Sequence, residues 1–288
     1  MPTPATIVMP LLRQVDAYLA RAVRSAIEQT VPSDVIVVIS PRTPASNLAI
    51  LERFALESPR VRIVMRPEGA GFPGAINAGI RQVTSPRFGL LLSDDWLDPD
   101  AIEVTLPWDA DIVSAGMNVY DADGTTFLPR VSGTVSAARY ASLTTIHARA
   151  QYLRHFFLFR TETARSVGGL DETLGDTPGI DDYDFIWTLL EHDATVALPG
   201  RSVYNCRDHP GERMTLRDPV AKAATLLRIL DKHGLVGAER DEIYRRHIRW
   251  YGRTLQETQQ ALDDEAARAG RGDAETYPPA PERESSAS

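Results

Sequence analysis

An apolar run that ends in two adjacent carboxylates stands at residues 90–100, which read Leu90-Leu91-Leu92-Ser93-Asp94-Asp95-Trp96-Leu97-Asp98-Pro99-Asp100. Residues 90–92 are typical of a buried strand, so Asp94 and Asp95 are expected at its carboxyl end. In an open parallel sheet, ligands bind at that end. Two hard oxygen donors there suit Mg²⁺ or Mn²⁺ holding a diphosphate. The alternative is a solvated turn in which Asp98 caps the start of a helix.

The sequence before this stretch alternates short apolar runs with helical patterns. Strands are predicted at 5–9, 35–39, 61–65 and 88–92, and helices between them at 17–27, 48–55 and 75–83. The first strand is expected to be closed by Pro10. Strands alternating with helices imply parallel strands joined by right-handed crossovers. The fold class predicted is therefore α/β, with a mostly parallel, Rossmann-like sheet flanked by helices.

The pattern loosens after residue 105. Further strands are predicted at 111–115, 156–159 and 195–198, and a hairpin at 118–127 around the turn Asp121-Ala122-Asp123-Gly124. Helices are predicted at 161–167, 182–191, 218–232 and 239–268. The last helix carries a stripe that predicts a packing face or a homo-oligomer contact. Its members are Ile243, Tyr244, His247, Trp250 and Tyr251.

Composition limits the class of protein. The 288 residues are 43% hydrophobic and 24% charged, which is typical of a globular protein. The net charge of -8 and pI near 5.3 argue against nucleic acid as a partner. No apolar run approaches the roughly 20 residues of a transmembrane helix, and no signal peptide is visible. The single Cys206 excludes an intrachain disulfide. A cytoplasmic location is expected.

Six segments, taken in order, resemble those of a family 2 glycosyltransferase of the GT-A fold. They lie at 26–32, at the glycine-rich 69–80, at the carboxylate-bearing 93–100, at Val167-Gly168-Gly169-Leu170-Asp171-Glu172, at Asp181-Asp182-Tyr183-Asp184, and at 204–211. The resemblance covers roughly residues 5–216. It implies a GT-A domain at 1–216, with a nucleotide-binding part at 1–105 and an acceptor-side part at 106–216. A C-terminal helical extension at 217–268 and a disordered tail at 269–288 would follow.

The resemblance implies transfer of a sugar from a nucleotide-sugar donor to an acceptor that the sequence does not identify. Asp94 would be the main ligand of Mn²⁺ or Mg²⁺, with Asp95 as a supporting partner and His209 completing the coordination. Asp182 would be the general base, and inversion at the anomeric carbon would follow. The alternatives are structural: His209 as a loop histidine, and Asp182 as a residue that caps and solubilises its helix.

Other side chains are candidates for contact with substrates. Donor contacts are expected from Pro10, Gly74, Asn77 and Trp96, and weaker acceptor-side contacts from Asp181, Trp187 and His155. An apolar ring face could stack on Trp96, and glycines let a ligand approach the backbone. The alternatives are a core role for Trp96, Trp187 and His155 and a helix-surface position for Asn77.

Three departures from the family pattern bear on the donor. No acid follows the second strand at Ile39-Ser40, Leu92 stands where the carboxylate motif usually begins, and Leu12-Arg13 replaces a polar residue near Pro10. Weak discrimination among nucleoside diphosphates is the expected consequence. A degenerate family member that binds a sugar or a partner without catalysis is one alternative function. A nucleotidyltransferase is another, although its usual basic, glycine-rich loop after the first strand is missing. A dinucleotide-dependent enzyme fits poorly, because no ribose-binding acid follows the second strand.

Overall fold

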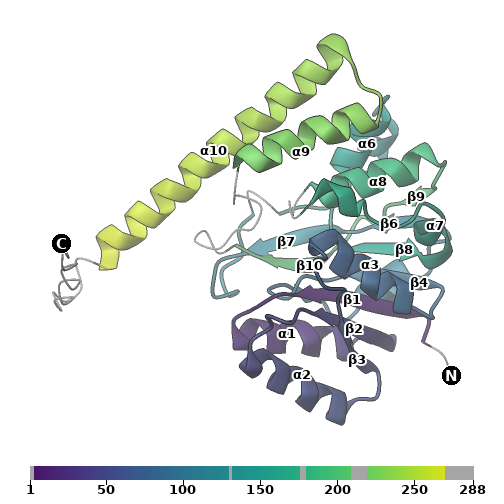
Figure 1. The fold of residues 1–288 in the computed structure, drawn as a ribbon, viewed down its shortest axis with the longest axis vertical. Coiled ribbons are helices and arrows are strands. Elements are labelled where there is room, and N and C mark those ends of the chain that lie inside the picture. The colour runs from purple at the N-terminus through teal and green to yellow at the C-terminus, as the bar shows by residue number, and fades with distance from the viewer. Residues whose placement is uncertain (1–2, 130–131, 176–179, 209–218, 270–288) are drawn as a thin grey trace, which may run out of the picture.

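A computed structural model of the chain describes residues 3–129, 132–175, 180–208 and 219–269. It contains a seven-stranded sheet in the order β3-β2-β1-β4-β8-β6-β9 and a three-stranded sheet in the order β5-β10-β7 (Figure 1). The strands are β1 Ala5–Leu11, β2 Ser33–Ile39, β3 Val61–Met65, β4 Arg87–Leu90, β5 Trp96–Leu97, β6 Ile112–Ser114, β7 Gly116–Tyr120, β8 Phe157–Arg160, β9 Val196–Ala197 and β10 Ser202–Arg207.

Helices cover both faces of the large sheet. They are α1 Asp16–Ile27, α2 Ala45–Glu57, α3 Phe72–Gln82, α4 Ala101–Thr105, α5 Ala137–Ala141, α6 Ile146–Tyr152, α7 Thr161–Ser166, α8 Asp181–Glu191, α9 Pro219–Lys232 and α10 Gly237–Ala269, with a short 3-10 helix η1 Glu172–Leu174. This is the GT-A type of α/β fold that the sequence predicted.

The parallel half of the sheet follows from its alternating apolar residues. Neighbouring residues of a strand point to opposite faces. On β1, Val8 therefore joins the core beneath α3 and α8, whereas Ile7 and Met9 join the core beneath α1 and α2. The strands β3, β2, β1 and β4 are all parallel, as predicted. Figure 1 shows α1 and α2 together on one side of these strands.

Pro10 lies inside β1 rather than after it. The register pairs Pro10 with Val38 of β2, whereas the pairing with β4 ends at Val8 and Leu90. The carbonyl of Val8 faces the β4 side, where it accepts from Leu91 N at 3.1 Å. Residues two apart point the same way, so the missing N–H of Pro10 faces the side where β4 has ended. A proline is tolerated at such a position.

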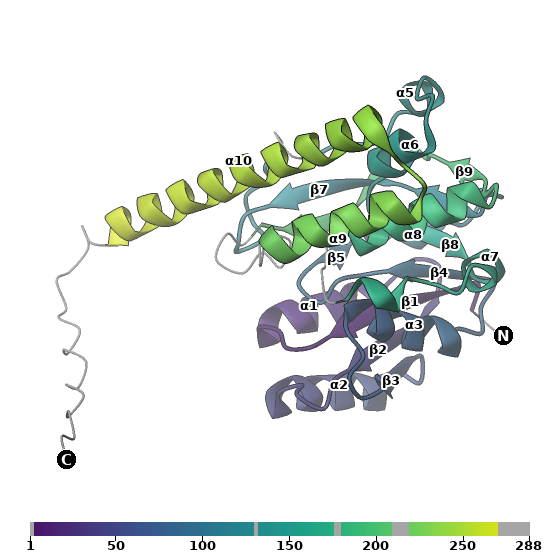
Figure 2. The same cartoon turned by 45° about the horizontal axis from the view of Figure 1, so that its top comes forward.

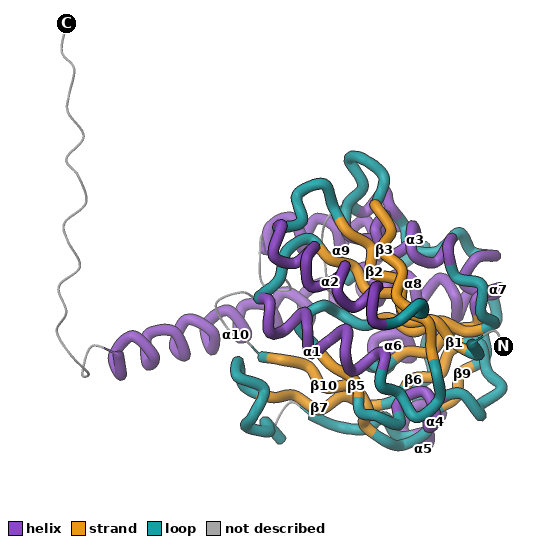
Figure 3. The backbone as a smooth tube through the Cα atoms, turned by 90° about the horizontal axis from the view of Figure 1, so that it is seen from below, coloured by secondary structure: helices purple, strands orange, loops and turns teal. Residues whose placement is uncertain are grey.

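The second half of the sheet breaks the parallel pattern. β8 is antiparallel to both β4 and β6, and β9 pairs in parallel with β6. The hairpin predicted at 118–127 forms in a short version. Gly124 N donates to Asp121 O at 2.9 Å in the turn, Tyr120 and Phe127 form an antiparallel bridge, and Leu128 N donates to Val119 O at 2.7 Å. The sequence did not predict that β7 also pairs in parallel with β10, and Figure 3 shows β7, β10 and β5 lying side by side.

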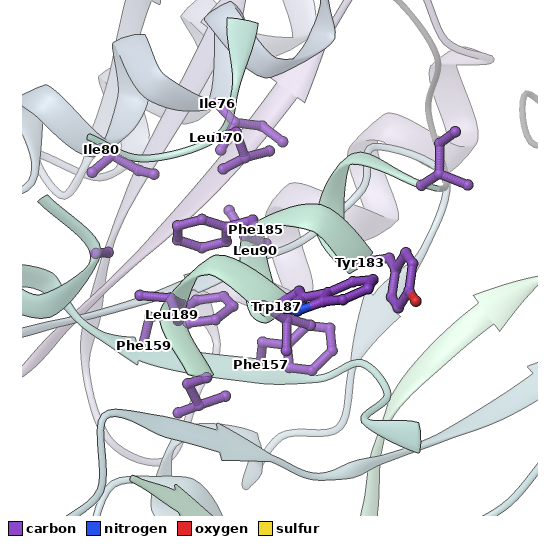
Figure 4. Packing of buried hydrophobic residues seen from close by; sticks show 14 of the residues in the cluster. Ile76, Ile80, Leu90, Phe157, Phe159, Leu170, Tyr183, Phe185, Trp187 and Leu189 are labelled. Atoms are coloured by element: carbon purple, nitrogen blue, oxygen red, sulfur yellow. The ribbon is translucent and has the colours of Figure 1, made fainter. Parts of the chain in front are cut away.

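The C-terminal helices pack on α8. Buried Leu226, Ile229 and Leu230 of α9 join the same core as Trp187 and Tyr183 of α8, which Figure 4 shows at close range. α10 covers α9 with its first turns and then extends away from the sheets (Figure 2). Trp250 and Tyr251 of the predicted stripe have side chains outside the described set, so the oligomer contact stays a prediction. The predicted tail also lies outside the described residues. No helix within 3–129, 132–175, 180–208 and 219–269 has the length and apolar composition to cross a membrane.

We expect Gly79→Ala to destabilise the fold because α3 lies so close to the sheet. A Cβ at position 79 would overlap the buried side chain of Val8 and come within 3.1 Å of Val38. Overpacking of this kind costs about 1–3 kcal/mol. Gly252→Ala is the matched control, since Gly252 is an exposed residue of α10 with nothing within 4 Å of a Cβ. Urea unfolding should show a lower free energy of unfolding for Gly79→Ala and no decrease for Gly252→Ala. Equal stabilities would contradict this packing.

Candidate active site

The candidate site lies at the carboxyl ends of the parallel strands. The turn at 93–95 follows β4 directly, because Leu91 still bonds to β1 through its backbone N. Asp94 is half-buried in this turn, and Asp95 is buried with only 2% of its surface exposed. Two adjacent carboxylates thus have different environments.

Asp95 points inward and is held by two donors. Tyr204 Oη donates to Asp95 Oδ2 at 2.6 Å, and Arg207 N donates to Asp95 Oδ1 at 2.8 Å. Burial and the neighbouring charge of Asp94 raise the pKa of Asp95 well above its usual range. These contacts join the turn after β4 to β10. Asp95 therefore anchors the turn to β10. Asp94, the adjacent residue in the same turn, is the more exposed of the two carboxylates.

Arg207 and Trp96 fix the same turn from the side of α1. Arg207 Nε donates to Asp94 O at 3.1 Å, and its guanidinium lies 3.8 Å from the centre of the Tyr18 ring. The Trp96 indole, only 8% exposed, has the guanidinium of Arg21 3.4 Å from its ring centre and Tyr120 at 5.0 Å. The predicted sugar-stacking role of Trp96 finds no open ring face here. The indole packs within the turn.

Asp182 lies at the start of α8 and meets His155, which immediately precedes Phe156 and β8. His155 Nε2 is 3.4 Å from Asp182 Oδ2, and Tyr183 N donates to Asp182 Oδ1 at 2.8 Å. The His155 ring in turn lies 5.1 Å from the ring of Tyr204, the residue that holds Asp95. The two predicted acidic motifs are therefore connected through His155 and Tyr204. The sequence placed His155 only on the acceptor side and did not predict this connection.

A buried lysine of α9 lies near the same carboxylates. Lys222 is only 1% exposed, and burial lowers its pKa to about 8, although the charges of Asp181 and Asp182 oppose the change. Asp181 is itself buried. Lys222 was not predicted as a site residue, because a lysine on an amphipathic helix is usually solvated.

Asp184 and Trp187 belong to the interface between α8 and α9 rather than to an open pocket. Asp184 accepts from Lys232 Nζ at 2.7 Å and lies 3.0 Å from His233 Nε2. The His233 ring stacks on Trp187 at 4.1 Å with planes 6° apart, and its Nδ1 lies 2.8 Å from Glu191. Trp187 is buried in this contact, so the structure gives it a packing role where acceptor contact was predicted.

Asn77 and Gly74 contact the turn at 167–172. Asn77 Nδ2 donates to Leu170 O at 2.8 Å and to Glu172 Oε1 at 2.9 Å, and Asn77 Oδ1 accepts from Leu170 N at 2.9 Å. A Cβ on Gly74 would meet Glu172 at 3.1 Å and Ala70 at 2.8 Å. Both residues thus hold the turn at 167–172 against α3. These contacts lie within the chain, and the predicted donor contacts of Asn77 and Gly74 stay predictions.

The ends of β1 to β3 are cationic. Arg13, Arg42 and Arg66 follow β1, β2 and β3 respectively, and none of them forms an ion pair within the part of the chain that the structure describes. Ser40, where the family has an acid, is buried in its own turn, with Ser40 N donating to Thr43 Oγ1 at 3.0 Å. The edge that would face a nucleotide therefore carries guanidinium groups.

The donor set for a metal is partly described. Asp94, the predicted main ligand, lies among the described residues, whereas His209 lies outside them. No three His, Cys, Asp or Glu side chains converge as a metal cluster among the residues that can be placed. A site that uses one protein carboxylate and the phosphates of a substrate is typical for Mg²⁺.

Comparison with known proteins identifies the family. The model of "Glycosyl transferase family 2" matches residues 6–169, which is more than half of the chain. The chain belongs to glycosyl transferase family 2. This membership sets aside the nucleotidyltransferase and dinucleotide-dependent alternatives and gives the chain a glycosyltransferase domain.

Relatives of this family 2 glycosyltransferase match over short segments. A chondroitin synthase and a hyaluronan synthase of Pasteurella multocida are each 35% identical over 89 residues, which are 31% of this chain and 9% of each synthase. The match thus spans a small part of those proteins.

Solved structures share the fold over most of the chain. S. aureus TarS 1-349 in complex with UDP-GlcNAc has a TM-score of 0.60 at 16% identity, covering 85% of this chain and 70% of that one. The mannosyltransferase PcManGT from Pyrobaculum calidifontis, in complex with GDP-Man and Mn²⁺, has a TM-score of 0.58 at 18% identity, covering 95% and 77%. These similarities establish the GT-A fold.

We expect Asn77→Ala to lower stability and to leave nucleotide affinity unchanged. The variant leaves the buried N–H of Leu170 without its acceptor and removes two further hydrogen bonds, at a cost of about 2–3 kcal/mol. Thermal unfolding should show the loss. Calorimetry with UDP and GDP in the presence of Mn²⁺, well below the melting temperature, should show wild-type affinity. Lost affinity at unchanged stability would instead make Asn77 a donor contact.

Proposed function

We propose that this enzyme is a metal-dependent, inverting glycosyltransferase that moves a sugar from a nucleotide sugar to an acceptor not yet identified. The observation that carries the proposal is the placement of Asp94, beside the anchored Asp95, and Asp182 around one aromatic residue. Tyr204 bonds to Asp95 and packs on His155, which contacts Asp182. A leaving-group site and a base site are thus held by one set of side chains.

The residues at the turn after β4 fit a divalent cation. Carboxylate oxygen is a ligand that Mg²⁺ and Mn²⁺ both accept, and one or two carboxylates with substrate phosphates complete many such sites. Asp94 would hold the cation, His209 would add a ligand, and Asp95 would keep the turn in place. When bound, the cation neutralises charge that develops on the departing diphosphate.

Asp182 has the properties that a base requires. Burial opposes its ionisation, but the contact with His155 and the N–H of Tyr183 outweigh burial and lower the pKa of Asp182. An ionised carboxylate can accept the proton of an acceptor hydroxyl as that oxygen attacks the anomeric carbon. The departing diphosphate takes the electron pair of the bond that breaks. In-line attack of this kind inverts the configuration.

Two observations support a nucleotide-sugar donor without naming its base. The structures with the same fold include complexes with UDP-GlcNAc and with GDP-Man. The unpaired Arg13, Arg42 and Arg66 give the strand ends a positive potential, which attracts a nucleoside diphosphate. Ser40 offers no carboxylate to a base, so we expect recognition of the base to use other groups.

Binding without transfer is the second candidate function. It is favoured by Ser40 and Leu92, which stand where the family pattern has acids. Release of free sugar from UDP-GlcNAc or GDP-mannose in the presence of Mn²⁺ would exclude it, because a binding protein would leave these compounds intact.

We expect Asp94→Ala to abolish the Mn²⁺-dependent part of nucleotide binding. The variant removes the protein carboxylate that would face the cation, whereas Asp95 retains its bonds to Tyr204 and Arg207. Calorimetry with UDP and GDP, with and without Mn²⁺, measures this effect. Asp123→Ala removes an exposed carboxylate of the hairpin turn and is the matched control. The assignment fails if Asp94→Ala keeps its metal-dependent gain in affinity.

We expect Asp182→Asn to reduce turnover by roughly two to four orders of magnitude, the usual contribution of a general base. Asparagine keeps the shape of the side chain and can still accept from Tyr183 N, so donor affinity should barely change. Hydrolysis of the sugar nucleotide identified as donor, with water as acceptor, measures turnover. If turnover survives and only the melting temperature falls, Asp182 is a helix cap.

A further inference from the structure

We propose that His155 is the positioning residue for Asp182: its Nε2–H holds the Asp182 carboxylate in a fixed orientation, and Tyr204 fixes the imidazole relative to the Asp94–Asp95 turn. This inference deepens the proposed function and rests on it, because it assigns a partner to the base. His155 itself would not touch the reacting atoms.

The Asp182 carboxylate has a different donor on each oxygen. Oδ1 accepts from Tyr183 N at 2.8 Å, and Oδ2 lies 3.4 Å from His155 Nε2. The first donor belongs to the rigid start of α8, and the second comes from the residue just before β8, on another part of the sheet. A carboxylate held from two directions cannot rotate freely about its last torsion. Such restraint is what proton transfer in one geometry requires.

The His155 ring is itself restrained by aromatic neighbours. It meets Phe157 edge-on, with centroids 4.7 Å apart and planes at 60°, and it lies 5.1 Å from the Tyr204 ring. Tyr204 is buried and bonded through its hydroxyl to Asp95. A shift of the Asp94–Asp95 turn therefore changes the surface on which His155 rests. The metal side and the base side of the site are coupled by packing.

The different surroundings of its two ring nitrogens favour one tautomer of His155. Nδ1 is buried and has no hydrogen-bond partner within the described residues, whereas Nε2 faces a carboxylate. A proton on Nδ1 would be buried without an acceptor, which is unfavourable. The neutral tautomer with hydrogen on Nε2 directs that hydrogen toward Asp182 and leaves only the lone pair of Nδ1 without a partner among the described residues. In this state His155 donates to Asp182 and keeps its proton while Asp182 receives one from the acceptor.

Other charges also face Asp182. Asp181 and Asp184 share α8, and Lys222 approaches from α9. Asp184 is paired with Lys232, and Lys222 acts on Asp181 as well as on Asp182. His155, in contrast, contacts Oδ2 of Asp182 directly. Removing its donor should therefore make the carboxylate easier to protonate.

The test compares His155→Phe with His155→Gln in the full chain. Phenylalanine keeps the ring contacts with Phe157 and Tyr204 but removes the donor, whereas glutamine places an N–H₂ group where Nε2 stood. The pKa of Asp182 is read from ¹³C-carboxyl NMR of aspartate-labelled protein, and Asp182→Asn identifies its signal. His192→Phe is the matched control, since His192 lies at the other end of α8, where Nδ1 is 2.8 Å from Thr188 O.

We expect His155→Phe to raise the pKa of Asp182 by about one unit. His155→Gln should restore most of the wild-type value, and His192→Phe should not change it. A role limited to packing would lower the melting temperature of the variants without moving this pKa. An unchanged pKa in His155→Phe overturns the inference.

A second measurement on the wild-type protein covers the case in which His155→Phe does not fold. ¹⁵N shifts of the His155 ring near neutral pH should show the proton on Nε2, and a proton on Nδ1 overturns the inference. Turnover separates this inference from the proposed function. If Asp182→Asn keeps full turnover, the proposed base is wrong. If Asp182→Asn is inactive while His155→Phe has the wild-type pKa and turnover, only the role of His155 is wrong.

Discussion

Asp95 is a buried carboxylate that bonds to two groups of one strand, and the arrangement of the site depends on it. An unpaired carboxylate in the interior costs several kcal/mol, so Tyr204 and Arg207 must stay in place for the turn after β4 to be stable. The same bonds fix Asp94 beside the turn and hold the Tyr204 ring against His155. The acid next to the candidate metal ligand thus determines the position of the base on another segment.

This dependence explains why the small sheet matters. β10 pairs in parallel with β7 and antiparallel with β5, so its residues tie the turn after β4 to the less regular half of the chain. Arg207, the last residue of β10, donates to Asp94 O and also to Ala122 O at 2.6 Å. The hairpin turn at 121–124 is therefore attached to the turn that carries Asp94. Movement of one would be transmitted to the other.

The sequence predicted the elements that are defined locally. The strands of the parallel half were predicted to within two residues at each end, because buried apolar runs and their flanking turns are local signals. β5, with two residues, has no such signal, since Trp96–Leu97 forms a strand only by pairing with β10. The partners of Asn77 and Trp96 were not predicted for the same reason, although a core role was one of the alternatives for Trp96. Residue type indicated a polar or aromatic contact, but Asn77 bonds to Leu170 and Trp96 packs on Arg21, neither of which can be deduced from local sequence.

The three acids at the start of α8 show how neighbouring residues of one type acquire different chemistry. Asp184 is neutralised by Lys232 and His233 of α9 and serves to attach that helix. Asp181 is buried near Lys222, also of α9. Asp182 alone meets a residue from the sheet side, His155, and keeps about a third of its side chain exposed. Lys222 and Lys232 of α9 oppose the negative charge of these acids, and positive charges favour the ionised form of nearby carboxylates. The packing of α9 on α8 is therefore part of the electrostatic surroundings of Asp182, although α9 lies outside the segment that defines the family.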